Sequence, residues 1–179
     1  VGFKKIKMGT LENVGSGEVE LPQQEMQTTG VWFSVDPALL ESVSPSREEC
    51  VDGLRALAYL IHHLAPIFLL CDIRDLGSWL GDRTPAEAGV VATTARSARA
   101  RLLASEQFNP TIYLYDSHPG GIGLAERLFQ ILTPLLGRGL ETLEHCRCRW
   151  GCPSCAGPVN EVGRRAKVVA TSILRRLLA

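Results

Sequence analysis

The sequence predicts an α+β fold with N-terminal β-hairpins, a mixed α/β core, and a C-terminal knuckle of four cysteines followed by an amphipathic helix. Three observations predict this class. Apolar residues alternate with polar ones near the N-terminus, as in half-buried strands. Later in the chain they recur every three or four residues, as in amphipathic helices. Four cysteines then lie within residues 144–157.

The first half of the chain contains strands and one long helix. Strands are expected in "FKKIKM", "EVEL" and "TTGVWFSV", with the turn residues "GSG" between the first two. A helix begins after Ser46, the expected N-cap with Glu49 as its capping-box partner, and ends at Pro66. The apolar run "IFLLCDI" that follows predicts a short buried strand.

The second half adds a strand and two helices to a single domain that spans residues 1–179. Residues 82–109 are predicted to be an insertion, either a helix that starts at "TPAE" or a mobile surface loop. "NPTIYLYD" predicts a strand with Ile112 and Leu114 on one face. One helix follows the glycine loop at 120–123, and a last helix begins at about Asn160.

Composition and charge narrow the class of protein. With 179 residues, 45% of them hydrophobic and 21% charged, the chain can bury a core of its own and is not disordered. The net charge is zero, but residues 138–179 contain eight Lys/Arg and three Glu, so that part carries +5 and residues 1–137 carry −5. This asymmetry favours a nucleic acid or an acidic partner, with an ordinary solvated surface as the alternative.

The chain shows no targeting or membrane signal. No apolar run is long enough to span a bilayer, and the N-terminus has no signal-peptide pattern, so we expect a cytoplasmic protein. The first residues enter a strand without an initiator Met, and we therefore expect the chain to belong to a longer protein. Six cysteines without a secretory signal indicate a reducing compartment, where clustered thiols bind metal more often than they form disulfides.

The four clustered cysteines have metal-ligand spacing, C-x-C-x3-C-x2-C, at Cys146, Cys148, Cys152 and Cys155. Two short ligand hairpins of this kind hold zinc in a closed tetrahedral site, which is structural because no position is left for water. The alternatives are an iron–sulfur cluster, a redox-active "CPSC" pair, and a zinc site in which the adjacent histidine replaces one thiolate. Cys50 and Cys71 lie in apolar surroundings and are expected to be buried free thiols.

Two further segments are candidate nucleic-acid contacts. In "YDSHPGGIGLAERL" the backbone at Gly120 and Gly121 either allows a close strand-to-helix crossover or contacts a phosphate. Basic residues cluster in the knuckle and the last helix, and the candidates are Arg147, Arg149, Arg164, Arg165, Lys167 and Arg175. Another interpretation of this segment is that Asp116 and His118 form a hydrolytic pair.

The motifs "YDSHPGGIGL" and "CRCRWGCPSC", in this order, resemble the C-terminal zinc-binding (MZB) domain of MrfA-type superfamily 2 DEAD/DEAH-box DNA helicases. "GFKKIK", "TTGVWF" and "LAPIFLLCDIRDLG" share the resemblance, which covers most of the chain apart from residues 82–109. It implies one zinc ion on Cys146, Cys148, Cys152 and Cys155, in a DNA-binding accessory domain of an ATP-dependent 3′-to-5′ helicase that acts in DNA repair.

The resemblance also implies partners. The helicase motor lobes, with their ATP and Mg²⁺, would precede this domain in the same polypeptide, and the domain would contact single-stranded DNA or a fork. The parent protein would be cytoplasmic and associated with the bacterial nucleoid, without a membrane partner. The chain itself has no Walker A motif and no DEAH-like box, so alone it should neither hydrolyse ATP nor unwind DNA. The alternative is a zinc-binding scaffold or partner protein of a helicase in phage defence.

Overall fold

The computed structural model describes residues 2–18, 25–82, 95–106 and 108–179. The N-terminal strands β1 (Gly2–Ile6) and β2 (Asn13–Glu18) form an antiparallel hairpin with a register shift between Lys5 and Ile6. The predicted α+β class, with its N-terminal hairpin and C-terminal cysteine cluster, is confirmed. The residues "GSG" do not form the turn, because they lie inside β2 and pair with residues 3–5 of β1, and most of the predicted strand "EVEL" lies outside the described residues. The helix start predicted at "TPAE" lies outside the described residues. None of the described helices is both long and apolar enough to cross a membrane.

A three-stranded antiparallel sheet forms the centre of the body, in the order β3 (Gly30–Ser34), β5 (Pro110–Asp116) and β4 (Leu76–Asp82). The predicted alternation on β5 is confirmed, because Ile112 and Leu114 share one face and are fully buried. Tyr113 lies on the other face between the rings of Trp32 and Trp79, with centroid distances of 6.4 and 5.2 Å.

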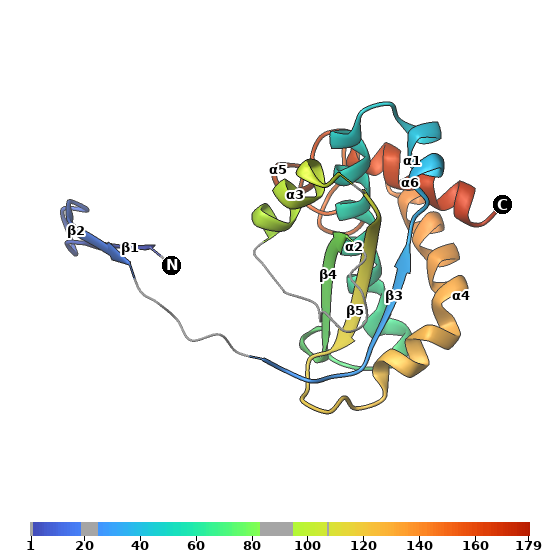
Figure 1. The fold of residues 1–179 in the computed structure, drawn as a ribbon, viewed down its shortest axis with the longest axis horizontal. Coiled ribbons are helices and arrows are strands. Elements are labelled where there is room, and N and C mark those ends of the chain that lie inside the picture. Colours follow the sequence, from blue (N-terminus) through green and yellow to red (C-terminus); the bar gives the residue numbers. More distant parts are fainter. Residues whose placement is uncertain (1, 19–24, 83–94, 107) are drawn as a thin grey trace.

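The helix α2 (Arg47–Leu69) is the central helix of the body. It packs against the sheet, against α4 (Leu124–His145) and against α6 (Ala166–Leu177), as Figure 1 shows. Gly53 of α2 allows the closest approach of α6, because a Cβ atom there would collide with the side chain of Val169. Shorter helices complete the fold, and they are α1 (Pro37–Val43), α3 (Ala95–Ala104), α5 (Val159–Val162) and the 3₁₀ turn η1 (Ile73–Asp75).

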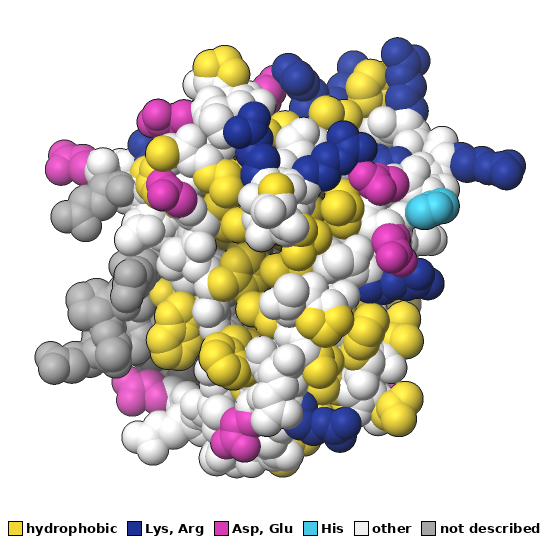
Figure 2. All heavy atoms as spheres, turned by 90° about the vertical axis from the view of Figure 1, so that its right-hand side faces the viewer, with side chains coloured by type: hydrophobic (Ala, Val, Ile, Leu, Met, Phe, Trp, Pro, Cys, Tyr) yellow, Lys and Arg dark blue, Asp and Glu magenta, His cyan; other side chains and the backbone are white. Residues whose placement is uncertain are grey.

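The hydrophobic core lies where these helices meet the sheet. The largest fully buried side chains come from all the long elements, and they include Leu54, Leu57, Leu60, Ile61, Ile112, Leu114, Leu128, Leu135, Leu143 and Ile173. Figure 2 views the side of the body that carries α4. Hydrophobic side chains gather in its middle, and Lys and Arg gather toward its upper edge.

The start of α2 follows the prediction, but its end does not. Ser46 is the predicted N-cap, and its Oγ accepts a hydrogen bond from the Glu49 N–H at 3.4 Å. The predicted capping box is not completed, because the Glu49 carboxylate accepts from the Ser44 hydroxyl and the Ser46 N–H donates to Ser44 Oγ. The helix continues through Pro66 to a left-handed cap at Leu70, so the predicted stop at Pro66 is wrong. Proline removes one backbone donor, and buried side chains on both sides of it, Ala65 and Leu69, keep the helix packed through that turn.

The segment after α2 also differs from the prediction. "IFLLCDI" is not a strand, because its first residues complete α2 and its last residue begins η1. The strand is β4, in "LGSWLGD", where Trp79 pairs with Tyr113 of β5. The last predicted helix is two helices, since Gly163 adopts a φ of +101° and interrupts it between α5 and α6.

Candidate metal centre and its surroundings

The four predicted cysteines meet in one cluster. Cys146 is the C-cap of α4, and the loop that follows brings the sulfurs of Cys148, Cys152 and Cys155 to it. All four Sγ atoms lie within 4.8 Å of one another, and four of the Sγ–Sγ distances are 3.4 to 3.6 Å. A tight turn holds the second pair, because the Cys155 N–H donates to the Cys152 carbonyl at 2.9 Å.

These distances fit a tetrahedral metal and not a disulfide. Zinc–sulfur bonds of about 2.3 Å at tetrahedral angles would place the sulfurs about 3.8 Å apart. A disulfide would bring two sulfurs to about 2.05 Å, and the four cysteines are free thiols in this structure. His145 points elsewhere, since its Nδ1 lies 2.8 Å from the Glu141 carbonyl oxygen, and it is not part of the cluster. The four thiols are therefore the donor set that suits Zn²⁺.

The cysteines differ in acidity. Hydrogen bonds from the Cys148 backbone and side chain lower the pKa of the Cys146 thiol to about 7. Burial raises the pKa of the Cys155 thiol to about 12. A metal binds thiolates, so binding here would release protons, most readily from Cys146, and the metal–sulfur bond would offset the cost of ionising the buried Cys155.

Two side chains from helices hold the knuckle (residues 144–157) against the body. Lys167 of α6 donates from Nζ to the carbonyl oxygens of Cys146 and Cys148, at 2.7 and 2.8 Å, and lies 3.5 Å from the Cys148 sulfur. Tyr59 of α2 donates to the Pro153 carbonyl at 3.0 Å. Because a site of Zn²⁺ and four thiolates has a formal charge of −2, the Lys167 ammonium also offsets charge there.

The predicted basic residues do not form one continuous surface. Arg165 and Arg175 form ion pairs with acids of neighbouring helices, Glu49 and Glu144. The Lys167 ammonium is directed at the knuckle backbone. The remaining three arginines of the prediction are exposed and form no ion pair with the described residues, and these are Arg147, Arg149 and Arg164.

The glycine loop is organised around one buried carboxylate. Asp116, at the end of β5, is fully buried and accepts the backbone N–H groups of Ile122, Leu124 and Ala125 at 2.6, 3.2 and 2.7 Å. The N–H groups of Gly120 and Gly121 donate to backbone carbonyls of the chain itself. The loop therefore has the geometry of a strand-to-helix crossover in which an internal carboxylate occupies the place of an anion at the start of α4.

The interpretation of Asp116 and His118 as a hydrolytic pair gains no support from this geometry. The Asp116 carboxylate is inaccessible to a substrate, and His118 pairs with Asp75 of η1 at 3.0 Å. The hydrogen bond from His118 lowers the pKa of the Asp75 carboxyl below its ordinary value of 3.8. The histidine thus ties the glycine loop to η1.

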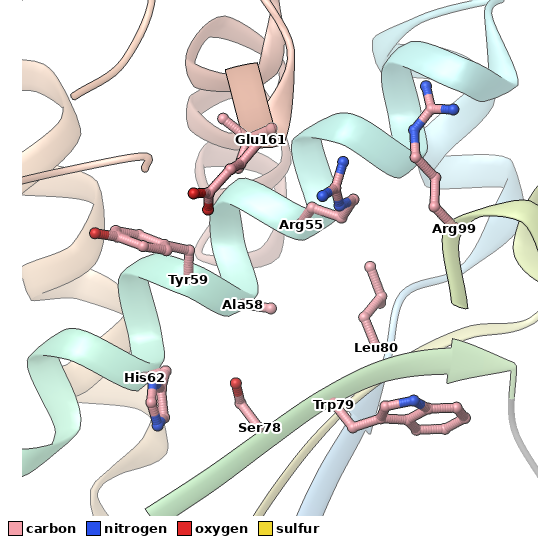
Figure 3. A pocket seen from close by; sticks show the side chains of 10 residues that line it. Arg55, Ala58, Tyr59, His62, Ser78, Trp79, Leu80, Arg99 and Glu161 are labelled. Atoms are coloured by element: carbon pink, nitrogen blue, oxygen red, sulfur yellow. The ribbon is translucent and has the colours of Figure 1, made fainter. Parts of the chain in front are cut away.

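A separate hollow of about 260 Å³ lies between α2 and β4 (Figure 3). Arg55, Arg99 and Glu161 line it together with Tyr59 and Trp79. Its arginines are already compensated, because Arg99 pairs with Glu48 and Asp52 at 2.6 and 3.0 Å, and Arg55 lies 3.9 Å from Asp52. Burial lowers the pKa of Arg55 from its ordinary value. The positive charges of this hollow are therefore already paired within the fold.

Sequence reasoning missed the roles of Tyr59, Lys167 and Asp116. No local pattern marks the first two, since Tyr59 lies 94 residues and Lys167 about 20 residues from the backbone groups that they hold. Asp116 did carry a signal. An acidic residue directly after a buried strand, and before a glycine loop and a helix, is in position to accept the first N–H groups of that helix.

Comparisons with known proteins agree with the site. The family model described as "MrfA Zn-binding domain" matches residues 57–156, which include all four cysteines. An ATP-dependent helicase of Bacillus subtilis (strain 168), YprA, is 34% identical over 165 residues, which are 92% of this chain and 19% of that protein. An uncharacterized protein of Methanocaldococcus jannaschii, MJ1572.1, is 31% identical over 131 residues, which are 70% of this chain and all of that protein.

A solved structure is similar along almost the whole chain. The crystal structure of the DUF1998 helicase MrfA bound to DNA matches with a TM-score of 0.64 and 30% identity, over 98% of this chain and 20% of that one. The chain thus spans about a fifth of the length of the helicases that it matches. The match of the family model over more than half of the residues shows that this chain belongs to the family of MrfA Zn-binding domains.

Proposed function

We propose that the chain is the zinc-stabilised C-terminal accessory domain of an ATP-dependent DNA helicase of superfamily 2. Zinc binds the thiolates of Cys146, Cys148, Cys152 and Cys155, and its role is structural because four thiolates fill the tetrahedron. The observation that carries the proposal is the four-sulfur cluster at zinc-like spacing, in a chain that spans a fifth of related helicases. Residues 1–179 form one domain, in which 82–109 are the insertion.

The domain contributes binding and not catalysis. ATP and Mg²⁺ act in the motor lobes, which belong to the same polypeptide outside this chain, and the whole protein unwinds DNA 3′ to 5′ in repair at the bacterial nucleoid. The DNA-bound state of the related MrfA helicase supports a DNA contact. Among the predicted contacts, Arg147, Arg149 and Arg164 are favoured because they form no ion pair with described residues.

The test has two readouts on the zinc-loaded chain. Metal analysis is expected to give one zinc per chain and no visible absorbance of the kind that iron–sulfur clusters show. Fluorescence anisotropy with a labelled single strand is expected to show binding that weakens as salt is raised, since Lys and Arg displace counterions from phosphates. Iron in place of zinc would contradict the metal assignment, and a chain that binds no DNA at low salt would contradict the DNA-binding role.

A second candidate function is a zinc-binding scaffold or partner of a separate helicase, as in a phage-defence system. The Methanocaldococcus jannaschii relative favours it, because this chain covers that protein completely, so the module also occurs without motor lobes. The mass of the natural protein distinguishes the two candidates. An antibody against this chain should detect a protein several times heavier than 19.5 kDa if the motor lobes are attached. A band near that mass would favour the partner protein.

A further inference from the structure

A shallow groove of about 240 Å³ lies between the knuckle and α6, and Arg149, Lys167, Val168, Thr171, Ser172 and Arg175 line it. Among the described residues none that lines this groove is acidic, in contrast to the hollow beside α2, although Arg175 of the lining is paired with Glu144. Its volume is below the roughly 300–1,000 Å³ of sites that enclose a drug-sized ligand. Its size and charge fit one phosphate group of a chain that passes across the surface.

The hydrogen-bond donors of the groove can be assigned one by one. Lys167 Nζ already contacts two carbonyl oxygens and one sulfur, which accounts for its three N–H donors. The hydroxyls of Thr171 and Ser172 donate to carbonyls one turn earlier in α6, at 2.8 and 3.0 Å. These three residues shape the groove, and the donors that can bind an anion must come from its two arginines.

Both arginines have donors to spare. Arg175 uses Nε and Nη2 for Glu144, which leaves three of the five guanidinium N–H groups. This pair is largely solvent-exposed, and such pairs contribute little to stability, so its geometry can adjust at low cost. The Cζ atom of Arg149 lies over the Trp150 ring, 4.4 Å from its centroid, and Arg149 forms no ion pair with the described residues. A cation over a ring is held by the ring quadrupole and not by a hydrogen-bond acceptor atom, so the guanidinium N–H groups remain available.

Trp150 adds an aromatic surface next to the groove. Its side chain is 40% exposed although it lies between two predicted zinc ligands, Cys148 and Cys152. An indole in that position can stack an unpaired base, whose π-face is hidden in a duplex. A zinc site of charge −2 would reduce the +5 of residues 138–179 to +3, which still attracts a polyanion.

We propose that this groove binds single-stranded DNA, with one phosphate between Arg149 and Arg175 and the adjacent base on Trp150. The inference rests on the proposed DNA-binding function and adds its contact site and its preference for an unpaired strand. It also separates Lys167 from the residues that contact DNA, because its ammonium is occupied by the knuckle.

The test measures binding of a labelled oligothymidine to the zinc-loaded chain at several salt concentrations. For single strands the slope of log K against log salt is about −0.7 per phosphate contact. Because the two arginines share one phosphate, each single change to Gln should weaken binding, and the double variant Arg149→Gln, Arg175→Gln should reduce the magnitude of the slope by about 0.7. Trp150→Ala should leave the slope unchanged and weaken binding about 5- to 100-fold, the range of base–aromatic stacking. A duplex of the same length should bind wild type and Trp150→Ala equally.

Arg138→Gln is the matched control, because Arg138 is also an exposed arginine paired with a glutamate on α4, at 2.6 Å, outside the groove. It should keep the wild-type slope. Zinc content and circular dichroism show that each variant is folded. Wild-type affinity and an unchanged slope in the double arginine variant would overturn the groove and leave the proposed function standing. Failure of the wild-type chain to bind the strand would overturn the proposed DNA contact itself.

Discussion

Replacement of Asp116 by Asn should destabilise the domain although it changes only one atom. Helix α4 begins after Gly123, an N-cap without a side chain, and Asp116 supplies the missing acceptor from the end of β5. Its Oδ2 accepts the Ile122 and Leu124 N–H groups, and its Oδ1 accepts that of Ala125. An amide has one oxygen, so at least one of these donors would face an NH₂ group.

The expected loss of stability in Asp116→Asn follows from the burial and the charge of the Asp116 carboxylate. Hydrogen bonds to a charged group contribute about 1.5–3 kcal/mol each, and a carboxylate at a helix N-terminus adds about 0.3–2 kcal/mol through the helix dipole. Because Asp116 is fully buried, water cannot replace the lost acceptor. We expect a loss of about 2–5 kcal/mol in the free energy of unfolding, or about 4–20 °C in Tm at roughly 2–4 °C per kcal/mol for a chain of this size.

Urea unfolding of the zinc-loaded chain, followed by circular dichroism, measures this loss. The matched control is Asp36→Asn at the N-cap of α1, where the exposed Asp36 accepts the Ala38 N–H at 2.8 Å. Asn caps helices as well as Asp does, so this variant should stay within about 0.5 kcal/mol of wild type. Equal stabilities for Asp116→Asn and wild type would refute the assignment of Asp116 as the internal cap.

Three other predictions concern the knuckle and the glycine loop. Chelation or Cys152→Ser should unfold the C-terminal third, because structural zinc contributes about 10 kcal/mol or more, and an unchanged melting curve after zinc removal would contradict this. Lys167→Met should lower the free energy of unfolding by about 1–3 kcal/mol and weaken the retention of zinc against a chelator. Arg164→Met is the exposed control, and equal zinc retention in the two variants would contradict the anchoring role of Lys167. His118→Ala should raise the pKa of Asp75 toward 3.8 in an NMR titration. Because the folded-state pKa of Asp75 is depressed in wild type, the contribution of Asp75 to stability is present above pH 3.8 and is lost as pH falls through the lower folded value. An Asp75 pKa that the substitution leaves unchanged would exclude the pairing.

The features that sequence predicts well here are those set by near neighbours. The spacing of the cysteines fixes which thiols can share a metal, and the N-cap at Ser46 and the alternation in β5 depend on a few adjacent residues. Strand β4 could not be recognised in this way. Its two glycines weaken any strand pattern, and they are required because the ring of Trp79 covers Gly81 and that of Tyr115 covers Gly77.

The site itself was only partly predictable for the same reason. Which basic residues are available to a ligand depends on partners far away in sequence, such as Glu49, which lies 116 residues from Arg165. The sequence shows a basic region, but only the packing of α6 against α2 and α4 shows which of its charges are already used.

The register between β4 and β5 has a consequence for the length of the chain that joins them. Asp82 and Pro110 are directly paired, so the segment from 83 to 109 leaves and re-enters the sheet at one place. The entropy of closing such a loop grows only with the logarithm of its length, by about 0.6 kcal/mol for each doubling. Residues added before α3 should therefore cost little, provided that Leu102 stays in the core and Arg99 keeps its contacts with Asp52 and Glu48. A reporter or affinity tag inserted before α3 should therefore leave the sheet intact.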